Sequence, residues 1–303
     1  MNTGSFDPNL LNQSVVAVPP LARDADFQID ADQNDAIVRH IESGGVRSLL
    51  YGGNAVLYHT SLDDLNTLCG VISDAAGPET TVVPSIGPSL GAALDQAEVI
   101  NHFDFGTVML LPSRDIVDSA GIASGVRILS EQLQRPIVLY LKYDRWMDPR
   151  DIAVLERDGL ISWIKYAVVR QDPSQDEYLR EVTDVFPKSR IVSGIGEQPA
   201  IVHLRDFGLT GFTSGCVCVT PQQSMDMLGS IQAGDFEHAE TIRQFFQPLE
   251  NLRDTIHPIR VLHHAVAAAG IADTGPIQPM LSGVDDETKQ KIDAALHQMG
   301  ILA

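Results

Sequence analysis

One lysine stands inside an apolar stretch of the chain. The segment ISWIKYAVV, residues 161–169, is rich in β-branched and aromatic residues, a composition typical of a buried strand, and Lys165 lies at its centre. Burial lowers the pKa of an ammonium group, because water no longer solvates the charge. A neutral amine can attack a ketone to form an iminium, so Lys165 is a candidate nucleophile. The alternative is a structural lysine whose amine reaches the surface or pairs with a carboxylate distant in sequence.

The chain has only five lysines, which narrows the choice of nucleophile: Lys142, Lys165, Lys188, Lys289 and Lys291. Lys188 lies in the expected turn FPKSR, and the last two lie in the polar segment DDETKQKID, so all three are expected to be solvated. Lys142 is a rival, since it ends another apolar run, PIVLYLK. The charged residues that follow it favour a wetter, protonated amine, and we therefore prefer Lys165.

Eight short apolar runs alternate with helical patterns along the chain. The runs cover residues 14–19, 47–53, 80–87, 107–112, 136–142, 161–168, 190–196 and 211–219. The segments between them, such as IDADQNDAIVRHIES, place apolar residues at helical spacing and begin near Asp or Ser. This alternation predicts an α/β protein, a (β/α)8 TIM barrel with catalytic groups on the strands and at their carboxyl ends. An open doubly wound sheet is the alternative, but no G-x-G-x-x-G segment follows the first run.

The helical patterns continue beyond the eight predicted strands. They cover roughly residues 221–232, 236–269 with breaks, and 285–298. Because no Pro/Gly/Ser-rich linker precedes them, they are expected to pack on the barrel instead of forming a separate domain. We predict a barrel over residues 1–233 and a C-terminal helical extension over residues 234–303.

Composition and charge exclude several kinds of partner. The formal net charge of −19 opposes binding to nucleic acid or to anionic lipid. The N-terminus lacks the features of a signal peptide, and no run reaches the roughly 18 apolar residues of a membrane span. The three cysteines, Cys69, Cys216 and Cys218, are odd in number and lie in apolar surroundings, which fits reduced thiols. We expect a cytoplasmic protein that binds neither nucleic acid nor membrane.

A metal-dependent aldolase or hydrolase on the same barrel is a competing class. Such an enzyme needs His, Asp or Glu ligands at strand ends. His102, His203, His263 and His264 fall mostly on predicted helices, and no H-E-x-x-H or H-x-H segment occurs. We predict neither a metal nor another cofactor.

Five segments together resemble the dihydrodipicolinate synthase and N-acetylneuraminate lyase family. Its members are (β/α)8 barrels that form a Schiff base between a lysine and pyruvate or a related 2-oxo acid. IVLYLKYDR is similar to the family's fifth strand, which carries a proton-shuttling tyrosine, and WIKYA to its sixth strand, usually G-I-K-x-A/S. YGGNAVLYHTS stands where the family has a G-T-T-G-E loop, and TGFTSGCVCVTP resembles its G-x-I-S-x-x-x-N-x-x-P segment. Near the C-terminus, the family's helix and the G-x-x-R-x-P-L segment after it are similar to HPIRVLHHAVAAAGIADTGPIQPML. The resemblance covers most of the chain and keeps the family's order of segments.

The resemblance implies a catalytic pair and an anion site. Lys165 would attack the 2-oxo carbon, and Tyr140 would relay protons as the carbinolamine collapses. The turn at Gly53 and Asn54 would hold the substrate carboxylate through backbone N–H groups and the polar side chain.

The resemblance also implies the walls of the pocket and the assembly. Gly194 and Ile195, in the segment SGIGE, would border the pocket. Arg145 aligns with an arginine that some members use for a second carboxylate, a task that suits a planar guanidinium. Members of the family are usually tetramers, so we expect a homo-oligomer. The expected partner is a small 2-oxo acid.

The chain departs from the synthases of this family at several positions. Gly53 and Asn54 replace two hydroxyl residues, and Val56 takes the place of a glutamate. Ser113 and Arg114 stand where many members carry a tyrosine that reaches into a neighbouring subunit. These departures favour an aldolase or dehydratase that acts on a sugar-derived 2-oxo acid. Dihydrodipicolinate synthase proper is one alternative, and a non-catalytic barrel that binds a small 2-oxo acid is another.

Overall fold

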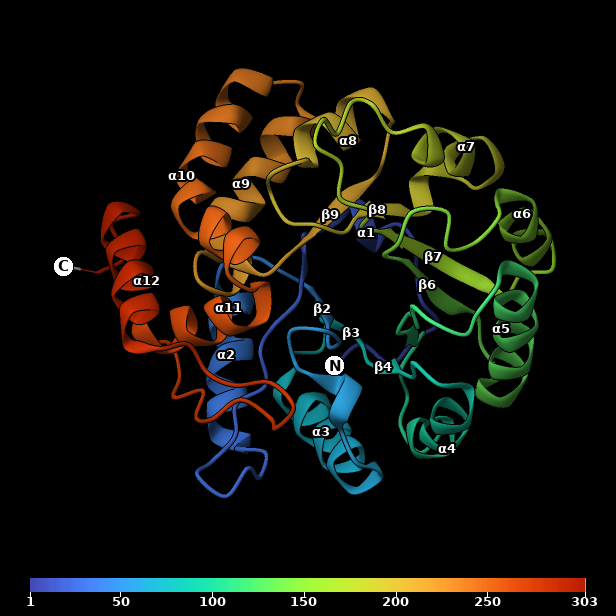
Figure 1. Ribbon diagram of the computed structural model, residues 1–303, viewed down its shortest axis with the longest axis horizontal. Helices are drawn as coiled ribbons and strands as arrows, with labels where there is room; N and C mark the ends of the chain where they lie inside the picture. Colours follow the sequence, from blue (N-terminus) through green and yellow to red (C-terminus); the bar gives the residue numbers. More distant parts are fainter. Residues whose placement is uncertain (303) are drawn as a thin grey trace.

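Nine parallel strands form a nearly closed barrel in the computed structural model, which describes residues 1–302 (Figure 1). The strands are β1 (Val16–Ala17), β2 (Ser48–Leu50), β3 (Thr81–Val83), β4 (Ser85–Ile86), β5 (Met109–Leu110), β6 (Ile137–Leu141), β7 (Ile161–Tyr166), β8 (Ile191–Ser193) and β9 (Gly211–Ser214). Each of them lies within one of the eight runs predicted from the sequence.

One bent segment closes the ring of strands. The strands are ordered β3-β2-β1-β9-β8-β7-β6-β5-β4, so β3 and β4 lie at the two ends of this order. Only Pro84 separates them in the chain, and proline has no N–H to continue a ladder. β3 and β4 therefore form the third strand of an eightfold barrel, and the predicted (β/α)8 fold is confirmed.

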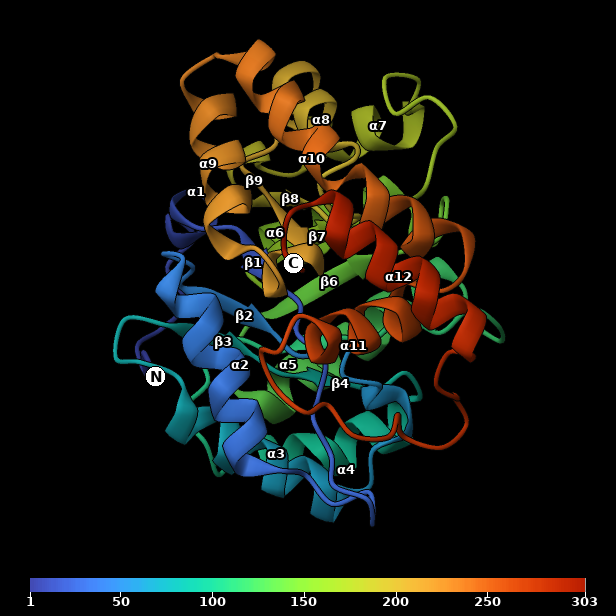
Figure 2. The same ribbon diagram turned by 90° about the vertical axis from the view of Figure 1, so that its left-hand side faces the viewer.

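Helices surround the barrel and follow each strand in turn (Figures 1 and 2). Among residues 1–302, every helix is too short or too polar to span a bilayer. The helices are α1 (Leu10–Gln13), α2 (Ala31–Ser43), α3 (Leu62–Ala75), α4 (Leu90–Ile100), α5 (Ser119–Leu133), α6 (Pro149–Arg157), α7 (Glu177–Val185), α8 (Ala200–Asp206), α9 (Pro221–Gln232), α10 (Phe236–Thr255), α11 (Pro258–Ala268) and α12 (Asp286–Gln298).

Side chains of Asp and Ser fix the starts of several helices. The Asp30 side chain accepts a hydrogen bond from the backbone N–H of Gln33 at the start of α2 (3.1 Å). Ser61 does the same for Asp64 at the start of α3 (3.1 Å). Such caps satisfy backbone donors that have no partner inside the helix, which is why these residues mark the boundaries predicted from the sequence.

The eighth strand is shorter than predicted. Residues 211–219 were expected to be extended, but β9 ends at Ser214 and a 3₁₀ helix, η3 (Cys216–Cys218), follows it. The Ser214 hydroxyl accepts a hydrogen bond from the Val217 N–H (3.0 Å), and Gly215 adopts a helical backbone conformation. A local hydrogen bond therefore ends the strand although the apolar sequence continues.

The last three helices pack together on one side of the molecule (Figure 2). The eighth strand–helix unit ends with α9, and α10 packs against α9, α11 and α12. The helical stretches predicted after the eighth strand are all present. The division of the chain at residue 233 stays a prediction.

Candidate active site

Lys165 is the penultimate residue of β7, a strand whose six residues are all buried. Its side chain is 5% exposed. In register it pairs with Tyr140 on β6 and with Val192 on β8. The amine lies 4.6 Å from the centroid of the Tyr140 ring. Among residues 1–302 it has no hydrogen-bond or ion-pair partner.

Burial lowers the pKa of the Lys165 amine to about 7, and the positive charges of Lys142 and Arg253 act in the same direction. A large fraction of this amine is therefore neutral near pH 7, as a nucleophile requires. The alternative predicted from the sequence was a structural lysine that reaches the surface or pairs with a carboxylate. The described residues provide neither arrangement.

A glycine makes room for the lysine. Gly194 follows β8, and a Cβ at this position would lie 2.9 Å from Lys165 Cγ and 2.8 Å from Ala167 Cβ. Its backbone N–H donates to the Tyr166 carbonyl (2.6 Å), which keeps the chain close to β7. The next residue, Ile195, is half-buried. The structure therefore brings Gly194 against Lys165, where the sequence analysis expected a pocket wall.

Three tyrosines lie around the amines of the site. The Tyr140 ring is half-buried, and burial, followed by Tyr58 and Tyr143, raises the pKa of its hydroxyl. Tyr58 belongs to a 3₁₀ helix, η1 (Leu57–His59), and its buried hydroxyl has no partner among the described residues. The amine of Lys142 lies 5.8 Å from the Tyr58 ring centroid and 5.9 Å from that of Tyr143. Sequence reasoning missed Tyr58 and Tyr143, although both lie in segments that it had singled out.

Lys142 differs from Lys165 in its environment. It follows the end of β6 and is exposed, as its charged neighbours predicted. Desolvation by neighbouring groups lowers the pKa of this amine too, without charged groups contributing. Its exposure to solvent makes Lys142 the weaker candidate for a neutral nucleophile.

The turn expected to bind the substrate carboxylate uses some of its polar groups in hydrogen bonds within the protein. The Asn54 side-chain amide donates to the Val18 carbonyl (2.7 Å) and is buried. The Gly53 carbonyl accepts from the Val56 N–H (2.9 Å), and Val56 has a left-handed backbone (φ 56°). The position of a Cβ on Gly53 is open, with no atom within 4 Å. The backbone of this turn is accessible, whereas the Asn54 nitrogen already has a partner.

The contacts of Arg145 are with residues of α7 and not with Lys165. Its guanidinium binds both carboxylate oxygens of Glu181 on α7 (2.7 and 2.8 Å) and lies 5.8 Å from the Tyr178 ring centroid. A role in binding a second substrate carboxylate would require this pair to break. Arg114 is exposed and lies 5.8 Å from the Tyr143 ring, while the Ser113 carbonyl accepts from the Trp146 indole (2.7 Å).

Sequence reasoning also missed a buried ionic cluster that consists of Glu197, Cys216, Glu250 and Arg253. Arg253 Nη1 donates to Glu250 Oε1, and Cys216 Sγ donates to the same oxygen (2.8 Å). Glu197 Oε1 accepts from the Ser224 hydroxyl (2.8 Å), while its Oε2 has no partner among the described residues. Burial, followed by the charge of Glu250, raises the pKa of Glu197 to about 7. The only signal in the sequence is the i,i+3 spacing of Glu250 and Arg253, which is common on helices.

The cluster has three groups that could ligate a metal. Ligand atoms of Glu197, Cys216 and Glu250 lie within 4.8 Å of one another. However, the Arg253 guanidinium already pairs with Glu250 and provides a positive charge at this point. A dication beside it would face electrostatic repulsion. We therefore interpret the cluster as the support of Arg253 and not as a metal site.

Comparison with known proteins gives relatives that match nearly the full chain. A DapA-like lyase of Halobacterium salinarum is 24% identical over 310 residues, covering 99% of this chain and 97% of the relative. The 4-hydroxy-tetrahydrodipicolinate synthase of Moorella thermoacetica is also 24% identical, over 292 residues, covering 94% of this chain and 97% of that protein. No family model matches the chain.

Solved structures share the fold. Dihydrodipicolinate synthase from Oceanobacillus iheyensis superposes with a TM-score of 0.86 at 20% identity, covering 96% of this chain and 98% of that one. YagE, an Escherichia coli K12 prophage protein solved in complex with pyruvate, gives a TM-score of 0.81 at 17% identity, covering 95% of this chain and 99% of that one. The resemblance predicted from the sequence motifs is confirmed by these relatives.

Proposed function

We propose that the chain is a class I lyase of the dihydrodipicolinate synthase and N-acetylneuraminate lyase family, and that it is an aldolase or a dehydratase that forms a Schiff base through Lys165. The substrate is pyruvate or a sugar-derived 2-oxo acid. The observation that carries the proposal is the Lys165 amine, which is buried, has no partner among residues 1–302, and has a pKa of about 7. Burying an amine without a partner costs stability, and a nucleophile is the chemical use of such a group.

In the proposed mechanism, Lys165 is the nucleophile and Tyr140 transfers protons. The neutral amine of Lys165 attacks the 2-oxo carbon, and the resulting carbinolamine loses water to give an iminium. The Tyr140 hydroxyl, on the neighbouring strand, donates and accepts the protons of these steps. The iminium then takes up the electron pair released when a carbon–carbon bond breaks in an aldolase or when an α-proton leaves in a dehydratase.

The binding roles follow from the same likeness. The backbone N–H groups at Gly53 and Asn54 bind the carboxylate next to the oxo group, and Gly194 and Ile195 form the wall beside Lys165. Arg145 binds a second carboxylate when the substrate has one, after it releases Glu181. The pyruvate in the YagE complex supports a 2-oxo acid as the ligand of this fold.

The altered loop residues support an aldolase or dehydratase over a synthase. Gly53, Asn54 and Val56 supply none of the hydroxyl and carboxyl groups of the G-T-T-G-E loop. Ser113 and Arg114 leave the chain without the tyrosine that synthases send to a neighbouring subunit. The comparisons favour neither the synthase itself nor a non-catalytic barrel.

Reductive trapping tests the proposal. Cyanoborohydride added with pyruvate should give a stable adduct whose mass is on the Lys165 peptide, because it reduces the iminium in place. Lys142→Ala is the matched control, since this second lysine is exposed, and the variant should still be trapped. An adduct on Lys142, or no adduct with any 2-oxo acid tested, contradicts the proposal. Screening sugar-derived 2-oxo acids for pyruvate release and for water loss then separates aldolase from dehydratase.

We propose in addition that the chain forms a homotetramer in the cytoplasm. The support for this assembly is the resemblance to a family whose members are usually tetramers. The free thiols of Cys69, Cys216 and Cys218 support a reducing compartment. Light scattering coupled to size-exclusion chromatography tests the tetramer: a mass of one chain contradicts it.

A further inference from the structure

Three glycines let three polar side chains approach the ends of the last two barrel strands. Gly194 makes room for Lys165, as described above. Gly196 has a positive φ (82°), and a Cβ on it would lie 2.6 Å from Glu250 Oε2. A Cβ on Gly215 would lie 2.5 Å from Arg253 Nη2. Helix α10 therefore places Glu250 against Gly196 and Arg253 against Gly215, as closely as Lys165 packs against Gly194.

Arg253 is held at two of its three nitrogens. Nη1 donates to Glu250 and lies 3.8 Å from Cys216 Sγ, and Nε donates to the Pro258 carbonyl (3.4 Å). Among residues 1–302, Nη2 has no hydrogen-bond acceptor. The side chain is only 10% exposed. Nη2 is thus the one guanidinium nitrogen without a partner among the described residues, and it is open to a ligand that the protein does not itself supply.

The free nitrogen faces the turn that follows β2. The position of a Cβ on Gly215 is 2.5 Å from Arg253 Nη2 and 3.1 Å from the side-chain nitrogen of Asn54. The Asn54 nitrogen uses one of its two N–H groups on the Val18 carbonyl and carries no charge, so it binds an anion more weakly than a guanidinium does. Arg253 therefore supplies, beside the Gly53–Asn54 turn, the free cationic donor that this turn lacks.

We propose that Arg253 Nη2 binds the carboxylate adjacent to the oxo group of the 2-oxo acid. The inference rests on the proposed Schiff-base function, because the carboxylate must lie within reach when the oxo carbon meets Lys165. A guanidinium keeps its charge at all accessible pH values and forms strong hydrogen bonds to carboxylates. Glu250 and Pro258 fix its plane, so the free nitrogen is oriented before the substrate arrives. Its positive charge also helps to lower the pKa of Lys165.

A neutral analogue of pyruvate separates carboxylate binding from every other effect. Pyruvamide keeps the oxo group and the shape of pyruvate but carries no charge. In Arg253→Gln, the half-saturating pyruvate concentration for cyanoborohydride trapping should rise by roughly 10- to 100-fold, the range for a lost hydrogen bond to a charged group. The value for pyruvamide should change by less than about 3-fold. Any change in the Lys165 pKa affects both ligands equally and cancels in their ratio.

Arg243→Gln is the matched control on the same helix. Arg243 forms an ion pair with Glu240 at the same i,i+3 spacing. It lies ten residues before Arg253 on α10 and donates a hydrogen bond to Gln198. Its replacement should leave unchanged the ratio of the half-saturating concentration of pyruvamide to that of pyruvate. A ratio that falls equally in Arg243→Gln, or that stays at the wild-type value in Arg253→Gln, overturns the inference.

Gly215→Ala tests the same contact with both charges kept. Residue 215 has φ −88° and ψ −39°, which alanine adopts freely, so only the added methyl group matters. The methyl group would lie 2.5 Å from Arg253 Nη2 and 2.8 Å from Cζ, so the guanidinium must move away, and the preference for pyruvate over pyruvamide should fall by about 10-fold or more. This variant covers the case in which Arg253→Gln unfolds because Glu250 loses its partner, and thermal unfolding of both variants shows which one to interpret. If the wild type is trapped by no 2-oxo acid tested, the Schiff-base function itself fails; if it is trapped by pyruvate and pyruvamide equally well, only the carboxylate anchor fails.

Discussion

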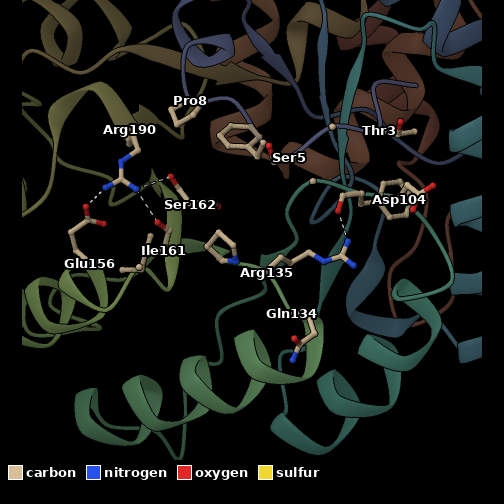
Figure 3. Close-up of a pocket in the computed structure, with 16 residues that line it drawn as sticks. Thr3, Ser5, Pro8, Asp104, Gln134, Arg135, Glu156, Ile161, Ser162 and Arg190 are labelled. Carbon is tan, nitrogen blue, oxygen red and sulfur yellow. Dashed lines mark hydrogen bonds and ion pairs between the residues drawn. The ribbon is translucent and has the colours of Figure 1, made fainter.

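The cations at the two ends of strand β7 differ in whether they have partners. At its start, Ile161 borders a cavity of about 530 Å³ that is lined by Arg135, Arg190 and Glu156 (Figure 3). Arg190 pairs with Glu156 and donates to the Ile161 carbonyl (3.0 Å). Arg135 donates to the Leu133 carbonyl (2.9 Å) and to that of Phe105. Four residues further along the same strand, Lys165 has none of these partners.

The difference indicates which end performs chemistry. Arginines that satisfy carbonyl and carboxylate oxygens at the strand starts stabilise the barrel, as the amino-terminal face of such barrels does in general. A cation that is buried without a partner destabilises the protein, and it persists only where another use maintains it. The pairing of the charges, and not the presence of a cavity, thus indicates the reactive end.

Replacement of Lys165 by methionine should have the largest effect. Turnover should be abolished, because no amine remains to form the iminium. Stability should rise instead of falling. The folded-state pKa of about 7 lies below the unfolded value of 10.5, so the unfolded chain binds more protons between these values and wild-type stability increases with pH across this window. The full penalty, on the order of 3–5 kcal/mol, is present at pH 6 and is partly relieved at pH 9.

Urea unfolding of the wild type and of Lys165→Met at pH 6 and pH 9 measures this effect. The gain in the free energy of unfolding should be larger at pH 6. Lys142→Met is the control, and its smaller burial should give a smaller gain at both pH values. A Lys165→Met protein that is less stable than the wild type at both pH values would falsify the idea of an unpaired buried amine.

Replacement of Tyr140 by phenylalanine should slow turnover by roughly 10²- to 10⁴-fold, the range for a lost general acid–base group. The ring remains, so its contact with the Lys165 amine is kept. Steady-state kinetics give the change in kcat, and cyanoborohydride trapping with pyruvate reports whether Lys165 can still react. A variant with unchanged kcat would remove Tyr140 from the proton relay and turn attention to Tyr58, whose buried hydroxyl has no partner among the described residues.

The pH dependence of kcat/KM should have an acid limb near 7. Only the neutral amine attacks the substrate, and burial lowers the pKa of Lys165 to about 7, so kcat/KM should fall about tenfold per pH unit below this value and level off above it. Rates measured from pH 5 to pH 10 with pyruvate as the reacting 2-oxo acid test this expectation. A profile that keeps rising to pH 10 would assign the reactive amine to an ordinary solvated lysine.

The barrel could be predicted from the sequence because its signals are local. Each strand is a short apolar run and each helix has a periodic pattern with a capping residue, such as Asp30 or Ser61. Lys165 stood out for the same reason, since its neighbours in the chain are also its surroundings in the fold. The error at residues 211–219 has a local cause that an apolar pattern does not reveal, namely the hydrogen bond from the Val217 N–H to Ser214.

The remainder of the site depends on contacts between distant parts of the chain. Arg253 lies 88 positions after Lys165 in a helix that looks amphipathic and ordinary, and only the barrel brings α10 to Gly196 and Gly215. The partner of Arg145, Glu181, is equally invisible in the sequence around it. Glycines whose missing side chains make room for a distant residue carry no signal that distinguishes them from glycines in turns.

Replacement of Arg190 by glutamine should affect stability and leave catalysis unchanged. The variant loses its ion pair with Glu156 and weakens the contacts with the Ile161 and Ser162 carbonyls, so the free energy of unfolding should fall by about 1–3 kcal/mol. Because these contacts lie at the start of β7 and Lys165 lies near its end, kcat and KM should stay within about twofold of the wild type. Urea unfolding and steady-state kinetics on the same preparation test both statements. A large loss of kcat in a folded Arg190→Gln protein would mean that the two ends of β7 are coupled, and that the pairing of charges at its start also positions the reactive amine.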